Sequence, residues 1–75
     1  MENVSRMSEQ MLDALEAKYK ADVLLAQSNI LVYIHNPVGI GDHPDVVAAI
    51  DNQVGALAQA EEKLTSLQSF RQRIN

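Results

Sequence analysis

The sequence predicts an all-α fold, in which two long amphipathic helices fold back on each other as an antiparallel hairpin. Two observations predict it. Large apolar residues recur at spacings of three and four before and after one segment rich in glycine and proline. The chain has only 75 residues, which is enough for a single domain spanning residues 1–75.

The first helix is expected at about residues 8–35. Ser8 is the expected N-cap, because Glu9 follows it in the first turn, and Ser5 is an alternative cap. No glycine or proline interrupts the segment before Pro37, which biases the preceding residue away from the helical region. The expected apolar stripe comprises Leu12, Leu15, Tyr19, Val23, Ala26, Ile30 and Tyr33.

A competing interpretation concerns the end of this helix. The run Ile30–Ile34 is rich in residues that favour strands, so it is also compatible with a β-strand. A strand needs a partner, and the sequence contains no second strand-like segment to pair with it. We therefore predict that the run is helical.

The turn is expected at residues 36–43, followed by a second helix at about residues 44–72. Gly39 and Gly41 can adopt the positive φ that a tight reversal needs. Asp42 is the expected N-cap, with His43 followed by Pro44 as an alternative start. The second apolar stripe comprises Val47, Ile50, Val54, Leu57, Ala60, Leu64, Leu67 and Ile74. Gly55, among alanines, is expected to mark a close helix crossing.

The second half of the first helix is apolar on more than one side, which predicts self-association into a helical bundle. A helix that is apolar nearly all round is a buried helix, and one partner helix cannot bury every side. A chain this short without cysteine also lacks the usual disulfide support of small folds. The expected oligomer interface comprises Leu24, Leu25, Ser28, Leu31 and Val32, with Ser28 and Asn29 setting the register.

The composition argues against several classes of function. Ten acidic and six basic residues give a net charge of −4, which disfavours duplex nucleic acid and anionic membranes as partners. No apolar stretch is long enough to span a bilayer, and the N-terminus lacks an apolar signal core, so a cytoplasmic protein is expected. No catalytic arrangement has recognisable spacing, so we expect neither an enzyme nor a cofactor.

Two weak chemical patterns surround the turn. His35, Asp42, His43 and Asp45 could supply metal ligands, but their spacing matches no helical ligand pair, so no metal site is expected. The Gly39–Gly41 segment resembles an anion-binding nest, but no basic residue follows it and acidic residues do. We expect a rigid reverse turn there.

The octapeptide from Asn36 to His43, Asn-Pro-Val-Gly-Ile-Gly-Asp-His, resembles a family of small helical proteins encoded by tailed bacteriophages. A second match lies in the following helix, at Ala60, Glu61, Lys63 and Leu64. The resemblance covers about half of the chain. It implies a phage-type source and the host-cell cytoplasm, and it brings no biochemical activity with it.

The expected function is therefore that of a non-enzymatic accessory protein, a homo-oligomeric helical interaction module that inhibits a host or defence protein. The alternatives are an oligomeric sponge that binds a small nucleotide signal at subunit interfaces, and a small virion assembly protein. The specific turn string predicts a partner contact at Asn36, Val38, Ile40 and His43. The alternative is that this string only builds a tight turn.

Overall fold

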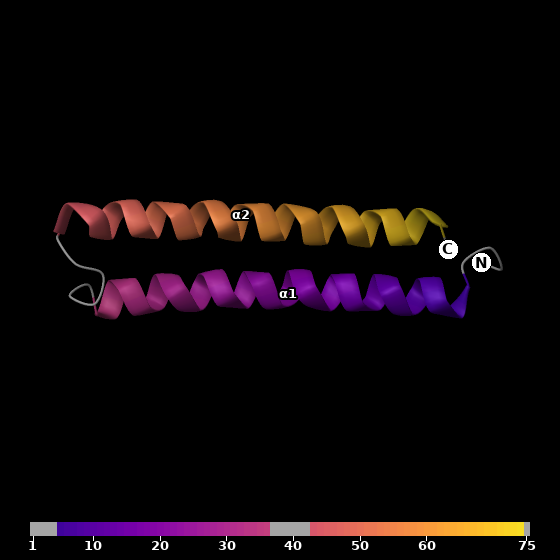
Figure 1. Ribbon diagram of the computed structural model, residues 1–75. Coiled ribbons are helices and arrows are strands. Elements are labelled where there is room, and N and C mark those ends of the chain that lie inside the picture. Colours follow the sequence, from indigo (N-terminus) through magenta and orange to yellow (C-terminus); the bar gives the residue numbers. More distant parts are fainter. Residues whose placement is uncertain (1–4, 37–42, 75) are drawn as a thin grey trace.

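The computed structural model describes residues 5–36 and 43–74, with the backbone alone for His43 and Pro44. Two α-helices account for nearly all of them: α1 spans Arg6–His35 and α2 spans His43–Ile74. The helices run antiparallel and side by side along their whole length (Figure 1). The predicted all-α hairpin is confirmed, and the run Ile30–Ile34 is helical rather than a strand.

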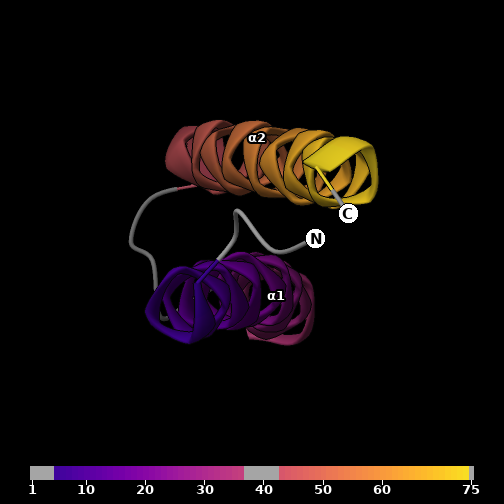
Figure 2. The ribbon, with the colours of Figure 1, turned by 90° about the vertical axis from the view of Figure 1, so that its right-hand side faces the viewer.

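The two ends of the hairpin differ in which parts of the helices they contain. The linker end is where α1 finishes at His35 and α2 begins at His43. The terminal end is where α1 begins at Arg6 and α2 finishes at Ile74. Seen along the helices, no third described element covers the outer face of either helix (Figure 2).

The start of α1 differs from the prediction by two residues. Ser5, not Ser8, is the N-cap: its hydroxyl accepts a hydrogen bond of 3.0 Å from the Ser8 backbone N–H. The Glu9 N–H closes the first turn on the Ser5 carbonyl at 2.9 Å. An N-cap side chain accepts from a backbone N–H two or three residues further along the chain, and Ser5 accepts from the third. Ser8 therefore belongs to the first turn as a donor, so the prediction that it caps the helix is wrong.

The other helix ends lie close to their predicted positions. α1 ends at His35 as expected, and the N–H of Asn36 still donates to the Val32 carbonyl at 2.8 Å. α2 begins one residue before the predicted Pro44 and continues two residues past the predicted end, to Ile74. The predicted cap Asp42 and both turn glycines lie outside the described residues.

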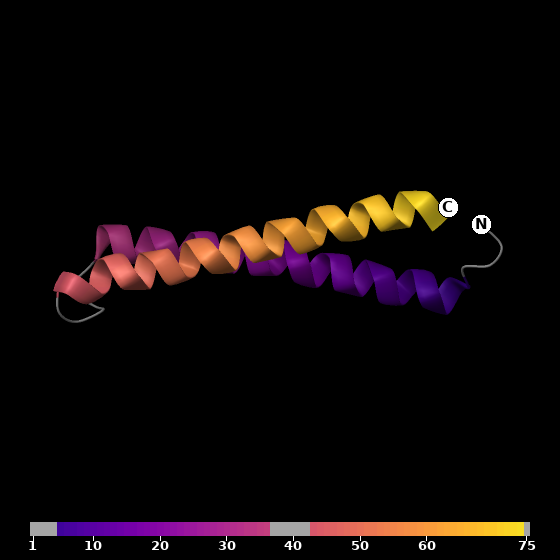
Figure 3. The same cartoon turned by 90° about the horizontal axis from the view of Figure 1, so that it is seen from above.

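The helices meet along one seam whose spacing alternates strictly between three and four residues, the pattern of a coiled coil. They cross at a shallow angle (Figure 3). The seam positions at this spacing are Leu12, Glu16, Tyr19, Val23, Ala26, Ile30 and Tyr33 in α1, and Val46, Ile50, Gln53, Leu57, Ala60, Leu64, Leu67, Arg71 and Ile74 in α2. Asp22, Asn29 and Ala49, beside these positions, are also half-buried.

For three residues, the prediction that they belong to the buried stripes is therefore wrong. Leu15 is 36% exposed, Val47 73% and Val54 48%. Glu16, Val46 and Gln53 occupy the seam in their place. One residue rotates a helix by about 100°, so neighbouring apolar residues cannot all point at the partner helix. Glu16 and Gln53 are polar, but each finds a polar partner across the seam, which hydrophobicity alone does not reveal.

The hairpin buries few apolar side chains. Its buried apolar side chains are those of Ala26, Ala60 and Leu67 among the described residues. The molecule measures 55 × 16 × 13 Å, and its radius of gyration is 16.8 Å, against about 11 Å for a compact chain of this length. Its accessible surface is 5633 Å², whereas about 4,600 Å² is typical for a compact monomer of this mass.

Gly55 does not mark a helix crossing. Gly55 is exposed, and a Cβ atom built on it would meet no heavy atom within 4 Å. The small residues that are buried in the seam are Ala26 and Ala60 instead. Gly55 lies away from α1, so the predicted close approach is not found between α1 and α2.

Candidate interaction surface

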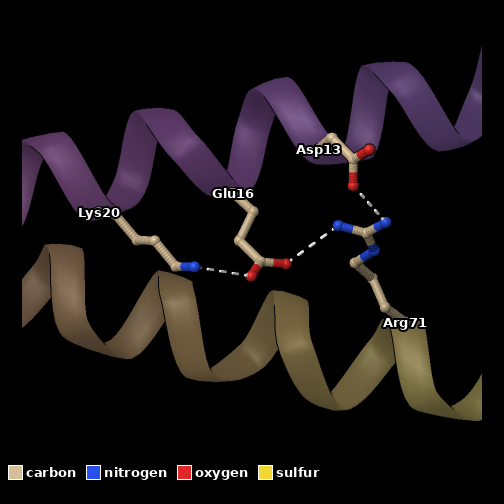
Figure 4. Close-up of polar contacts among 4 residues, drawn as sticks. All are labelled: Asp13, Glu16, Lys20 and Arg71. Carbon is tan, nitrogen blue, oxygen red and sulfur yellow. Dashed lines mark hydrogen bonds and ion pairs between the residues drawn. The ribbon is translucent and has the colours of Figure 1, made fainter.

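A cluster of charged side chains joins the two helices toward the terminal end (Figure 4). The guanidinium of Arg71 in α2 donates to Asp13 at 2.8 Å and to Glu16 at 3.0 Å, both in α1. Lys20 approaches the other oxygen of Glu16 at 3.3 Å. Arg71 and Glu16 keep about a fifth of their side-chain surface exposed. These contacts fix α1 and α2 in one register where the seam is polar.

This arrangement shifts the ionisation of Glu16 and Arg71. Partial burial raises the pKa of the Glu16 carboxyl, but hydrogen bonds from Lys20, Gln68 and Arg71 outweigh it and leave the pKa below its ordinary value of 4.5. The hydrogen bond to Asp13 is the main reason that the pKa of Arg71 is raised further. Glu16 and Arg71 are therefore both charged near neutral pH.

A second polar contact crosses the seam nearer the linker end. The Asn29 amide donates to the Gln53 carbonyl oxygen at 3.2 Å. Asn29 was expected to set the register between subunits, and here its side chain contacts α2 of its own chain. Together with the Arg71 cluster, this contact shows which residues of α1 and α2 lie level with each other.

The predicted interface residues form an exposed apolar surface on α1. Leu24 is 63% exposed, Leu25 60%, and Leu31 and Val32 56% each, and Ser28 between them is also exposed. They lie on the side of α1 that faces away from α2, because the seam occupies the opposite side. We call these five residues the outer face of α1.

Charged residues are scarce in the linker half of the hairpin. From Val23 to Asn36 the sequence contains no Asp, Glu, Lys or Arg, and residues 46–60 of α2 contain only Asp51. The charges of α1 all lie between Arg6 and Asp22. The linker half of the hairpin is thus apolar and the terminal half charged. An exposed apolar surface without charges is typical of a protein-interaction site.

Open grooves lie along the described helices, and two of them are lined by residues of both α1 and α2. One, of about 180 Å³, is lined by Leu25, Ala56 and Lys63 among others. The other, of about 320 Å³, is lined by Tyr19, Leu67 and Phe70 among others. The Lys18 and Lys63 amines lie 5.8 and 5.9 Å from the centre of the Tyr19 ring, at the edge of a cation–π contact.

The predicted partner contact at the tip is described only in part. Asn36 is exposed and ends α1. Val38 and Ile40 lie outside the described residues, and His43 is described by its backbone, as the first residue of α2. The His35 ring nitrogen Nδ1 lies 2.8 Å from the Leu31 carbonyl oxygen, so the His35 side chain folds back onto its own helix.

Two further features bear on function. No three His, Cys, Asp or Glu side chains within residues 5–36 and 45–74 are grouped so that they could hold a metal ion. Neither α1 nor α2 contains an apolar stretch long enough for a membrane span.

The comparisons with protein-family models, curated proteins and solved structures each return no match. The interpretation of this surface therefore rests on the geometry of the chain itself.

Proposed function

We propose that this protein is a non-enzymatic helical interaction module that works as a homo-oligomer, with a dimer as the smallest unit. The observation that carries the proposal is the outer face of α1, whose large apolar residues are more than half exposed in a stretch without charge. Water is an unfavourable environment for such a surface, and a second protein surface removes it from water.

The energetics of a single hairpin support the same proposal. Ordering the backbone costs about 1–2 kcal/mol per residue, and burial of apolar surface must offset it. With three buried apolar residues among those that the structure describes, one hairpin offsets little of that cost. The accessible surface exceeds that of a compact monomer by about 1,000 Å². A standard interface buries about 800 Å² on each partner, so the excess is enough for one.

In the cell, we propose that the oligomer is a phage-type accessory protein that occupies a host or defence protein. The resemblance of the Asn36–His43 string to phage proteins supports this assignment. A nucleotide sponge is the rival, and the net charge of −4 disfavours it. Pull-down from infected cells tests for a protein partner, and thermal shift against cyclic and linear nucleotides tests the rival.

Leu31→Asp tests the proposed self-association. We expect the wild-type protein to have a mass of at least twice 8.3 kDa in light scattering at micromolar concentration. Leu31→Asp should dissociate the oligomer or unfold it, because an unpaired charge in an interface costs about 3–5 kcal/mol.

The matched control is Asn52→Asp, which adds the same charge at about the same height on the exposed side of α2. This variant should keep the wild-type mass. A wild-type protein that is folded and monomeric throughout the concentration range would contradict the proposal.

A further inference from the structure

The seam is flanked by two sides of the hairpin, and one of them continues the apolar surface onto α2. Each residue of this side comes one position after a seam residue in the sequence. In both helices these residues are therefore rotated out of the seam in the same direction. We call it the first side: Asp13, Lys20, Gln27 and Ile34 from α1, and Val47, Val54, Glu61 and Gln68 from α2. The contact between Asp13 and Arg71 shows that this side of α1 reaches α2.

The first side changes character along its length. Toward the linker end it carries Ile34, Val47 and Val54, which are 56%, 73% and 48% exposed. Leu24 and Leu31 adjoin it, because each lies three residues before a first-side residue of α1. Toward the terminal end it carries Asp13 and Glu61. Any partner that covers this side must match an apolar half followed by a charged half.

The polar contacts across the seam show which first-side residues are level. Because the helices are antiparallel, each step forward in α1 matches one step back in α2. Counted from the pair Asn29–Gln53, Leu31 lies level with residue 51, and counted from Glu16–Arg71 it lies level with residue 56. This stretch of α2 contains Val54. The same count places Lys20 level with residues 62–67, next to Glu61. Leu31 is thus level with Val54, and Asp51, three residues before Val54, adjoins the first side at the same height, where it stays exposed. Lys20 is next to the acidic Glu61.

We infer that a second copy packs on the first side, about a two-fold axis parallel to the helices, with both linker ends together. This inference rests on the proposed self-association and adds its geometry. The second copy covers the edge of the outer face of α1 that holds Leu24 and Leu31, whereas Leu25 and Val32, on the other edge, stay exposed. Such an axis places α1 of each copy on α2 of the other, at the same height. Leu31 then packs on the partner's Val54, and Lys20 reaches the partner's Glu61. In this four-helix arrangement, each helix is antiparallel to both of its neighbours.

The opposite orientation fits the same surface poorly. A two-fold axis perpendicular to the helices would place α1 on α1 of the partner with the ends reversed. With the hairpins fully overlapped, Leu31 and Ile34 would then cover the terminal half of the partner, where Glu9 and Asp13 lie. Burying carboxylates under apolar side chains costs several kcal/mol for each charge. A staggered overlap avoids that cost but buries only half of each hairpin.

Cysteine cross-linking distinguishes the two orientations cleanly, because the chain contains no cysteine of its own. Leu31→Cys is made in one chain and Val54→Cys in a second chain that carries a tag to change its mass. One portion of each variant is oxidised alone. The remaining reduced portions are mixed, unfolded, refolded together and then oxidised. Asn52→Cys, on the exposed side of α2, replaces Val54→Cys in the control mixture.

We expect the Leu31→Cys and Val54→Cys mixture to give a disulfide-linked heterodimer, at least fivefold more than either variant alone or the control. Preferential linking of Leu31→Cys to itself would overturn the inference in favour of the staggered overlap with reversed ends. A dimer in light scattering that forms none of these links would also overturn it, while the proposed self-association would stand. A wild-type protein that is monomeric would contradict both the inferred geometry and the proposed self-association.

Discussion

At the scale of single residues, the hydroxyl of Ser5 determines where α1 begins. It accepts the Ser8 N–H, one of the amide groups that the first turn leaves without a helical partner. We expect Ser5→Ala to lower the free energy of unfolding by about 1 kcal/mol. Ser8→Ala is the control, because its backbone N–H remains and only a hydroxyl contact on the surface is lost. Urea unfolding followed by circular dichroism measures both, and a larger loss with Ser8→Ala would contradict the assignment of the cap.

Glu16 makes the stability of the hairpin sensitive to acid. Its pKa in the folded protein lies below the ordinary value of 4.5. The stability that it contributes is therefore fully present above pH 4.5 and is lost as the pH falls through the lower, folded-state pKa. We expect the melting temperature to fall on acidification from pH 6 to about pH 3.

Glu16→Gln isolates this contribution. The variant should melt at a lower temperature than the wild type at pH 6, and it should lose less on acidification. Glu62→Gln, which changes an exposed carboxylate without an ion pair to any described residue, should keep the wild-type pH profile. Parallel pH profiles for the wild type and Glu16→Gln would show that the Arg71 cluster does not stabilise the fold.

At the scale of the helix, Gly55 is a weakness in α2. It is exposed, and no atom stands where a Cβ would be placed. Since glycine costs about 1 kcal/mol relative to alanine within a helix, Gly55→Ala should stabilise the protein by about that amount and raise the melting temperature by about 4–8 °C. Gly55→Ser should give a smaller gain. Destabilisation by Gly55→Ala would reveal a close contact at this position in the oligomer.

At the scale of the whole molecule, the inferred dimer places Lys20 beside the partner's Glu61 twice. Lys20→Glu alone and Glu61→Lys alone should each weaken dimerisation roughly tenfold, because each creates two like-charge contacts. Mixing the two variants should restore the affinity, since both contacts in the heterodimer again join opposite charges. Analytical ultracentrifugation measures all three, and a mixture as weak as its components would argue against this arrangement.

The sequence by itself determined the two helices and most of their seam. Apolar residues at spacings of three and four place Leu57, Leu64 and Leu67 on one side of a helix regardless of what covers it, and Pro37 limits the first helix. The exposed outer face of α1 was predictable for the same reason, because one neighbouring helix cannot cover an apolar residue on every side.

Only the tertiary structure decided which of two adjacent residues enters the seam. Glu16, Gln53 and Arg71 are polar, and hydrophobicity favours Leu15, Val54 and Phe70 in their places. The polar residues occupy the seam because each has a partner on the other helix: Arg71 for Glu16 and Asn29 for Gln53. Such pairing depends on the register between two segments far apart in the sequence, which helical periodicity within either segment does not contain.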